Sequence, residues 1–451
     1  MDHINNPAWA LWPWRAWKSP LEQFKVLPTF VINEWTYRAV TLTCAWHAHK
    51  TGNWPLWFSS WICGTFNDAF FMAMPFCDNF WQAQACVMLT PRMPLYIVEM
   101  YAAIIYSSTT AARRFGLPYL SEAALTGTLA HLMYHTYDIN GPRYLWWTWH
   151  DADPSIGKRQ LNAPVGSSMW ILTYCAIHAA LQRWVSDLNP PQFLDLAKQV
   201  VQRIQPLVRA TRVEQLANKS FHLAEFMASK LDWFQTKLVH LPTLVKICFC
   251  GSVCTPLFMM GMGPFQILGL DTLGVPGQRT YRTALLVYAV ILARALWLKQ
   301  TVGPTPVSLT TQVANLGLFK ALVCFYAMQM GVSAFGRPEA HLSTGCHQKV
   351  AESKTAKDIM GYKREEHLVD EINGPVLFSP TDYQFPPVTT KPTFDNAGRQ
   401  VVLPKDSPEW YTVVGRKHEP GRRWAEFKGV ALFSFMGTLL YGTALAGPFT
   451  N

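Results

Sequence analysis

Six side chains in the N-terminal part of the chain are of the kinds that transfer protons or bind metals. These acids and imidazoles are Asp68, Asp78, His135, Asp138, His150 and Asp151. They lie within or beside mostly apolar stretches, and an ionisable group at the centre of a membrane helix costs roughly 2.5 to 3.5 kcal/mol. A cost of this size favours a functional role, which would be general acid–base catalysis on an isoprenoid or another lipid.

A structural role explains the same residues with fewer assumptions. Asp78 and Asp151 fall at the ends of apolar stretches, where water, Arg92 or Arg143 can satisfy a carboxylate. Hydrogen bonds between helices can satisfy the others. We therefore favour the structural interpretation and assign no catalytic residue, while the six side chains stay the candidates for an enzymatic alternative.

A metal site is a further possibility that the spacing raises. His131 and His135 are four residues apart, as zinc ligands on one helix often are, but two histidines without a third ligand form a weak site. Three cysteines between residues 248 and 254 are more simply explained by apolar packing. The sequence also has no glycine-rich phosphate loop and no CxxCH haem motif. We expect neither a metal nor an organic cofactor.

Long apolar helices would have to position these side chains. A bilayer core of about 30 Å requires roughly 20 mostly apolar residues per spanning helix. Windows of this kind recur eight or nine times, at residues 29–49, 54–74, 94–110, 120–137, 163–185, 244–262, 281–298, 311–331 and 427–446. The sequence therefore predicts an all-α fold, a polytopic transmembrane bundle of eight or nine spanning helices.

The regions between the windows complete the predicted organisation. Residues 190–241 are rich in charge and have apolar residues at helical spacing, which indicates amphipathic helices. Residues 336–424 are polar and rich in proline, which indicates mostly irregular structure. The predicted regions are an interfacial segment 1–28, helices one to five in 29–189, the amphipathic insertion 190–241, helices six to eight in 242–335, the polar segment 336–424 and a last spanning helix in 425–451.

Composition and charge narrow the classes of partner. The chain is 50% hydrophobic and only 15% charged, whereas globular domains are about a quarter charged. Its net charge is +10, but the basic residues lie between apolar stretches and form no single patch, so we expect no nucleic acid. Membrane lipids and other membrane subunits are the expected partners, with the subunits bound through residues 190–241 and 336–424.

Aromatic and basic residues indicate where the chain would meet lipid headgroups. Tryptophan prefers the membrane interface, and arginine pairs with anionic headgroups. The residues of these two kinds that we assign to the interface are Trp9, Trp12, Trp14, Arg15, Trp17, Arg113, Arg114, Trp146 and Trp147. They predict bound phospholipid of the cardiolipin type.

Several motifs resemble an uncharacterised eukaryotic family of multi-pass membrane proteins. They are DNFWQAQ at residues 78–84, PRMPLYI at 91–97, YDINGPRYLWWTWHDADP at 137–154, STGCHQ at 343–348 and EWYTVVGRK at 409–417. The family pattern has His at the position of Gln82, an acid at that of Tyr134 and a VPWTSYYFH-like run where NAPVGSSMW stands here. The order of acid, Trp-x-Trp and Val-Pro elements is also similar to carotenoid hydratase-type membrane enzymes.

Three functional hypotheses follow from the sequence. The first is a non-catalytic accessory subunit of a large membrane complex, with a mitochondrial energy-transducing assembly in the inner membrane as its setting. The second is a membrane-embedded enzyme that acts on an isoprenoid, a carotenoid or another lipid through the carboxylate and histidine cluster. The third is a transporter, although paired broken helices are not evident.

Overall fold

The computed structural model describes most of the chain. The described residues are 16–73, 80–83, 85–90, 93–144, 146–149, 159–161, 163–187, 241–269, 277–298, 306–337 and 420–447, together with the backbone of six short strands between residues 343 and 402. The predicted insertion 190–241 lies almost wholly outside these residues. Its boundaries, like those of the other predicted regions, stay predictions.

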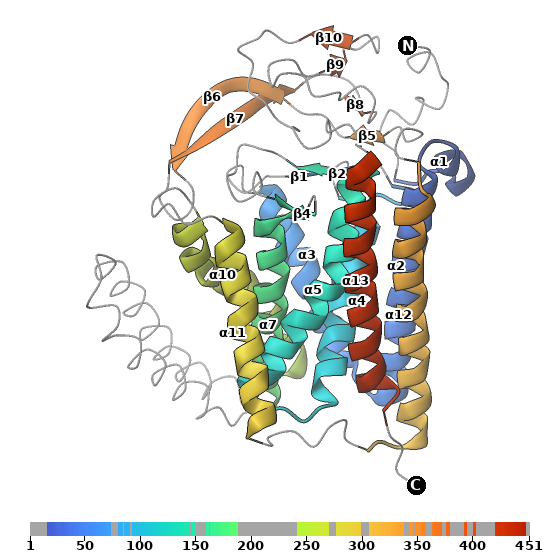
Figure 1. The fold of residues 1–451 in the computed structure, drawn as a ribbon, viewed down its shortest axis with the longest axis vertical. Coiled ribbons are helices and arrows are strands. Elements are labelled where there is room, and N and C mark those ends of the chain that lie inside the picture. The colour runs from blue at the N-terminus through green and yellow to red at the C-terminus, as the bar shows by residue number, and fades with distance from the viewer. Residues whose placement is uncertain are drawn as a thin grey trace.

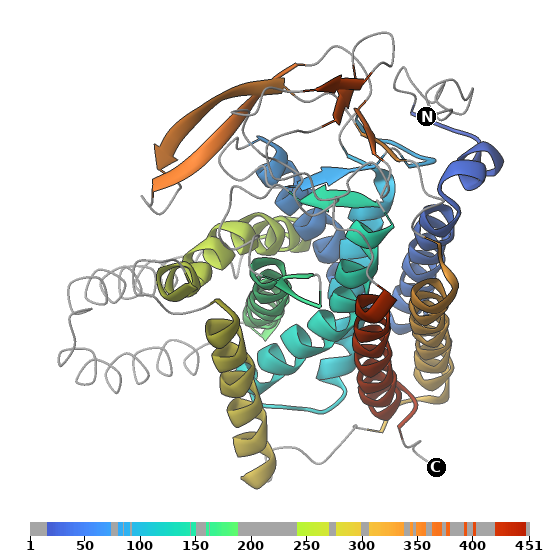
Figure 2. The same ribbon diagram turned by 45° about the horizontal axis from the view of Figure 1, so that its top comes forward.

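Ten helices make up most of the described structure (Figure 1). They are α1 (Pro20–Val26), α2 (Pro28–Thr51), α3 (Trp54–Ala73), α4 (Leu95–Arg113), α5 (Tyr119–Arg143), α7 (Val165–Asp187), α10 (Thr243–Gly269), α11 (Gly277–Trp297), α12 (Leu309–Phe335) and α13 (Pro420–Leu445). Figures 1 and 2 show the long helices side by side as a bundle.

Local sequence signals set some of the helix ends. Pro28 begins α2, a position where the missing N–H of proline costs nothing. The same helix ends at Gly52, whose φ of 68° lies in the left-handed region that favours glycine. Trp54 then begins α3, so the chain reverses within a tight connection and the two helices run antiparallel.

Short antiparallel strand pairs accompany the helices. Strand β1 (Phe80–Gln82) pairs with β2 (Trp147–Trp149), with Phe80 opposite Trp149. This ladder joins two segments that the sequence analysis identified as separate motifs. The remaining pairs are β3 (Arg159–Gln160) with β4 (Ala163–Pro164), β5 (Ser343–Gly345) with β8 (Val376–Phe378), β6 (Lys349–Lys357) with β7 (Lys363–Glu371), and β9 (Pro392–Phe394) with β10 (Gln400–Val402).

Helix α4 is the most enclosed helix of the bundle. Every residue from Tyr96 to Ala112 is buried, and α2, α3, α5, α7 and α13 all pack against it. Many of its side chains are small, such as Ala102, Ala103 and Ser107, and small side chains let neighbouring helices approach closely. The bundle interior is therefore built around α4.

The prediction of eight or nine spanning helices is wrong. Among the described residues, only two helical segments are long and apolar enough to cross a membrane, Leu309–Phe335 and Trp424–Leu445, while Thr243–Phe258 is a shorter apolar helix. The sequence windows failed because they counted tyrosine, tryptophan and small residues as apolar. Helix α5, for example, carries Glu122, His131, His135 and Asp138.

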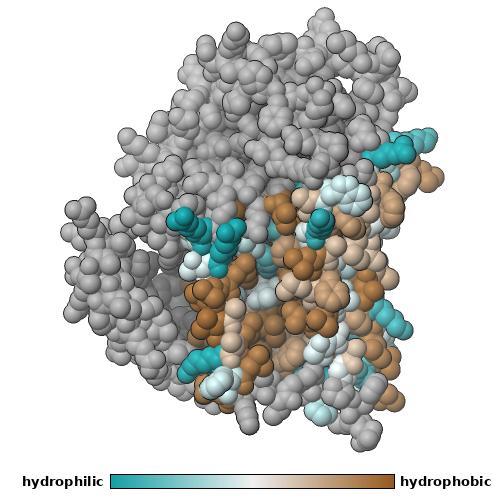
Figure 3. Space-filling view, in the orientation of Figure 1, coloured by the Kyte–Doolittle hydropathy of each residue, from teal (hydrophilic) through white to brown (hydrophobic). Residues whose placement is uncertain are grey.

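The outer surface of α11, α12 and α13 is largely apolar. Large hydrophobic side chains that are exposed there include Leu286, Val290, Val313, Leu432 and Phe435. Figure 3 shows hydrophobic residues on this face between levels of hydrophilic ones. The bundle therefore has polar side chains inside and apolar side chains outside along these helices.

The contact between α12 and α13 gives a first prediction. A β-carbon at Gly437 would overlap the ring of the buried Tyr326, so Gly437→Ala should lower the free energy of unfolding by about 1 to 3 kcal/mol through overpacking. Gly331 on α12 has no heavy atom within 4 Å of a β-carbon, and Gly331→Ala should be neutral or stabilise by up to about 1 kcal/mol. Thermal unfolding in mild detergent compares them, and equal shifts would contradict the packing described.

Candidate functional site

Five buried tyrosines gather between α2, α4 and α5, and we call them the tyrosine cluster. They are Tyr37, Tyr96, Tyr101, Tyr134 and Tyr137, none more than 6% exposed. The hydroxyl oxygens of Tyr96 and Tyr137 are 2.8 Å apart, and Tyr96 also donates a 3.0 Å hydrogen bond to Oε1 of Gln82. The rings of Tyr37 and Tyr137 meet edge to face at 5.4 Å between centroids.

Helical spacing on α5 presents this cluster. Three residues of α5 follow Tyr134 at distances that bring them to the same side of the helix: Tyr137 three residues later, Asp138 four and Gly141 seven. Gly141 leaves room for the ring of Trp147, which a β-carbon would overlap. The β1–β2 ladder, which contains Gln82 and Trp147, thus closes one end of the cluster.

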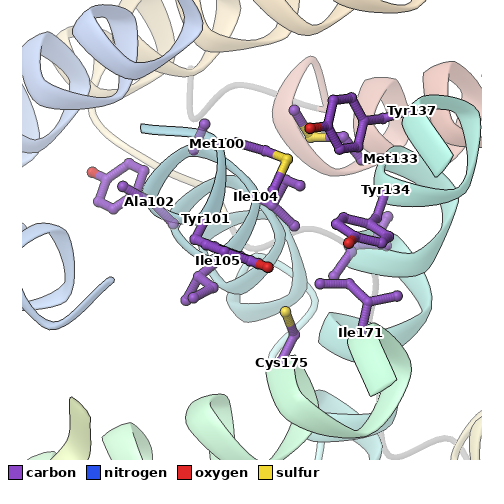
Figure 4. Close-up of a cluster of buried hydrophobic side chains, with 14 of the residues drawn as sticks. Met100, Tyr101, Ala102, Ile104, Ile105, Met133, Tyr134, Tyr137, Ile171 and Cys175 are labelled. Carbon is purple, nitrogen blue, oxygen red and sulfur yellow. The ribbon is translucent and has the colours of Figure 1, made fainter. Parts of the chain in front are cut away.

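Two fully buried aspartates lie beside the tyrosines. Asp68 on α3 and Asp138 on α5 are both 0% exposed. Burial raises the pKa of Tyr134 well above its ordinary value, and a charge on Asp138 or Asp68 raises it further. The same two charges also raise the pKa of Tyr101 beyond the effect of burial. Two carboxyl groups, from α3 and α5, which both pack against α4, therefore act on the same pair of hydroxyls, which point toward each other in Figure 4.

Some polar atoms in this region have no hydrogen-bond partner among the described residues. They are the hydroxyl of Tyr37, the side-chain amide oxygen and nitrogen of Asn67, and Nε1 of Trp170. An unsatisfied buried group costs about 1 to 3 kcal/mol. Trp170 packs 5.4 Å from Tyr101 and 5.7 Å from Tyr134 between ring centroids, so its Nε1 borders the tyrosine cluster.

The histidine pair forms a neighbouring polar site. His131 and His135 stack at 5.0 Å between ring centroids. Nε2 of His131 lies 2.6 Å from the hydroxyl of Tyr281, and Nδ1 of His135 lies 3.0 Å from Oγ of Ser168. Nε2 of His135 has no partner among the described residues. Phe433 of α13 packs 4.4 Å from the His135 ring.

A buried ionic cluster was not found by sequence reasoning. Glu34 accepts hydrogen bonds from the backbone N–H groups of Cys86 and Val87 at 2.9 and 3.2 Å. Arg38 lies 3.4 Å from Glu34 and 3.0 Å from Glu99. These contacts fix the loop before α4 against α2. The signal in the sequence was the spacing of Glu34 and Arg38, which suits an ion pair within a helix.

The structure brings together only part of the predicted acid–base set. Asp68 and Asp138 share the tyrosine cluster, and His135 lies one turn away from Asp138 on α5. Asp78, His150 and Asp151 lie outside the described residues. Arg143, which was expected to satisfy interfacial carboxylates, instead pairs with Glu426 of α13 at 3.6 Å. In the part of the chain that the structure describes, no three His, Cys, Asp or Glu side chains are arranged to hold a metal.

The predicted interface residues fall in different places. Trp9, Trp12, Trp14 and Arg15 lie outside the described residues, whereas Trp17 is 57% exposed. Arg113 lies 3.7 Å from Glu122, and Arg114 is buried with Nε donating to the carbonyl oxygen of Ala444. Trp146 and Trp147 are buried inside the bundle and do not face its outer surface.

The described structure is thus a mainly helical bundle whose apolar core contains many buried polar side chains, with two helices long and apolar enough to cross a membrane. A family model described as Domain of unknown function (DUF7802) matches residues 4–188. The predicted resemblance to an uncharacterised family is confirmed over this range, which includes Asp68, Asp138 and the tyrosine cluster. The motifs after residue 340 lie outside the match, and the likeness to carotenoid hydratase-type enzymes stays a prediction. No curated protein and no solved structure matches the chain.

The histidine pair predicts a loss of stability in acid. Burial lowers the pKa of His131 to about 4 and that of His135 well below its ordinary value. The folded state therefore binds fewer protons than the unfolded chain, whose histidines titrate near 6.5. The contribution is complete above about pH 6.5 and falls by about 1.4 kcal/mol per pH unit and per histidine as the pH drops toward 4.

Unfolding in detergent between pH 7 and pH 5 measures this effect. His131→Gln should make the pH dependence shallower by about 1.4 kcal/mol per unit. His49 is exposed, so His49→Gln is the matched control and should leave the slope unchanged. An equal change in both variants would contradict the assignment to the buried pair.

Proposed function

We propose that the tyrosine cluster with Asp68 and Asp138 is an acid–base site that acts on a membrane lipid of isoprenoid or carotenoid type. The observation that supports this most directly is the complete burial of both aspartates beside the hydroxyls of Tyr101 and Tyr134. Burial away from water disfavours charge on a carboxyl group. Two carboxyl groups in different surroundings can thereby serve as an acid and a base at the same pH.

The chemistry that fits these groups is the movement of a double bond. One carboxyl group transfers its proton to a carbon of the double bond, whose electron pair forms the new C–H bond. Tyrosine ring faces stabilise the cation that remains on the neighbouring carbon. The other aspartate removes a proton from an adjacent carbon, and the released electron pair forms the shifted double bond. The reaction consumes no co-reactant, and the proton taken up by the second aspartate replaces the one that the first aspartate gave.

A membrane location suits such a substrate. Helices α12 and α13 are long and apolar enough to cross a bilayer, and α13 packs against α5, which carries Asp138. Phe433 of α13 also contacts His135, which stays a candidate acid or base from the sequence together with Asp78, His150 and Asp151. A lipid in the bilayer would therefore lie beside α13, which packs directly against the helix that holds Asp138.

Substitution of the aspartates tests the proposed chemistry. Asp68→Asn and Asp138→Asn should each lower product formation by about a hundredfold or more, since an amide cannot donate or accept the proton. Cells that express each variant are grown in deuterium oxide, and mass spectrometry measures deuterium at carbon in extracted lipids. Wild-type chain should raise the deuterium content of one lipid class, and the variants should not.

Buried tyrosines supply the matched controls. Tyr134→Phe should reduce deuterium uptake, whereas Tyr441→Phe removes a buried hydroxyl that contacts Ser108 outside the cluster and should leave uptake unchanged. Unfolding midpoints of all variants identify any that fail to fold. Identical lipid and deuterium profiles for wild type and folded aspartate variants would refute the enzymatic proposal.

A second candidate is a non-catalytic accessory subunit, which the apolar outer surface favours. Exposed side chains such as Leu286, Leu432, Phe435 and Leu439 could contact lipid or another subunit. The net charge of +10 complements anionic lipids of the cardiolipin type, which supports a mitochondrial inner membrane. Residues 190–241 and 336–424 remain the proposed partner-binding segments.

Native electrophoresis tests whether the chain is an accessory subunit of a larger complex. An accessory subunit should migrate in mild detergent with a complex much larger than the 51.1 kDa chain. Deletion of residues 190–241 should release it from that complex while the bundle stays folded. Migration of the intact chain as a monomer would exclude the subunit role and leave the acid–base proposal unaffected.

A further inference from the structure

Four of the exposed aromatic side chains lie at one end of the bundle, and we call this group the aromatic end; others, such as Trp297 and Phe58, lie elsewhere. Its members are Trp17, Phe24, Phe335 and Trp424, which are between 46% and 84% exposed. They come from four separate places in the chain: the segment before α1, α1 itself, the last residue of α12 and the first part of α13.

Contacts between helices show that these places share one end. Gln329 of α12 donates to Asn33 near the start of α2, so the end of α12 lies beside the start of α2. Val430, near the start of α13, clusters with Met330 of α12. Helix α1 packs on α2 and directly precedes it. Figure 1 shows α1 with the upper ends of α12 and α13.

We infer that the aromatic end lies in the headgroup layer of a bilayer and marks one boundary of its hydrocarbon core. Tryptophan and other aromatic rings are favoured at this depth because they combine an apolar body with a polar or polarisable edge. Exposed basic residues, Lys25 and Lys428, accompany the rings at this end, and these suit lipid phosphates. The inference rests on the membrane location in the proposed function and adds the depth at which the bundle lies in the bilayer.

Helix lengths give an independent measure of the same placement. Gln312 of α12 donates to the carbonyl oxygen of Leu445 at the far end of α13, so these residues share a level. From Phe335 to Gln312 the rise of α12 is about 35 Å, and from Trp424 to Leu445 that of α13 is about 32 Å. Both values agree with a core of about 30 Å, so the two helices define a common pair of boundaries.

Most large exposed side chains of α12 and α13 between the boundaries fit this depth. On α13 the exposed residues Leu432, Phe435, Met436 and Leu439 are all apolar. On α12 the exposed Lys320 lies about 22 Å from Phe335 along the helix. It therefore lies about 12 Å inside the level of Gln312, and the long chain of a lysine extends its ammonium group toward the headgroups on that side.

Spin labels at single cysteines test the depth. Native Cys324 is exposed on α12 and lies eleven residues, or about 16 Å, from Phe335, while Phe435 lies equally far from Trp424. Labels at Cys324 and at Phe435→Cys should therefore be near the bilayer centre, and labels at Phe335→Cys and Trp424→Cys near the phosphates. Every labelled protein has Cys77, Cys248 and Cys346 replaced by serine. In the Phe335→Cys, Trp424→Cys and Phe435→Cys variants, Cys324 is replaced by serine as well.

Collision with oxygen and with a water-soluble nickel chelate in phosphatidylcholine vesicles reports the depth. The oxygen-to-nickel ratio should be several-fold higher at Cys324 and residue 435 than at residues 335 and 424. Equal ratios at all four sites in protein that resists alkaline carbonate extraction would overturn the boundary alone. Release of the protein by carbonate would also overturn the membrane location. Neither outcome depends on lipid conversion, which the aspartate variants test separately.

Discussion

The interior of the bundle has to satisfy its polar side chains from within. Asn140 of α5 donates to the side chain and backbone of Gln329 on α12, and Gln329 donates in turn to Asn33 on α2. His47 contacts both Tyr106 and Asn315 at 2.8 Å. A hydrogen bond contributes about 1 kcal/mol, but a buried group left without one costs up to about 3 kcal/mol. The cost of leaving a buried polar group without a hydrogen bond therefore favours the one arrangement of helices in which these groups meet.

The same constraint attaches the last helix to the first half of the chain. Residues 336–419 separate α12 from α13, yet α13 is fixed by Glu426 to Arg143, by Tyr441 to Ser108 and by the Ala444 carbonyl to Arg114. Loss of one partner from a buried ion pair costs about 3 to 5 kcal/mol. The region that matches the family model is thus completed by a helix from outside it.

Sequence reasoning found helix positions far better than helix surroundings. The window at residues 54–74 agrees closely with α3, and that at 29–49 with α2, because proline and glycine mark their ends. The number of spans was wrong because aromatic and small residues resemble lipid-facing residues in a window, although here they line an interior. Asp68 and Asp138 were recognisable as charges in apolar stretches. The tyrosine cluster was not, since a buried tyrosine has the periodicity of any core residue.

Buried polar atoms without a described partner, such as Nδ2 of Asn33 and Oδ1 of Asn140, occur in several parts of the interior and do not by themselves distinguish a structural role from a catalytic one. The Asn140, Gln329 and Asn33 chain has partners for several of its polar atoms, and helix packing alone explains it. At the tyrosine cluster the hydroxyl of Tyr37 has no described partner, and Asp68 and Asp138 are fully buried. A buried carboxyl group is costly to keep in a core, and local rules are typically broken at functional sites. The burial of Asp68 and Asp138 beside the tyrosines, and not the unpartnered polar atoms, is therefore the feature on which the proposed acid–base role rests.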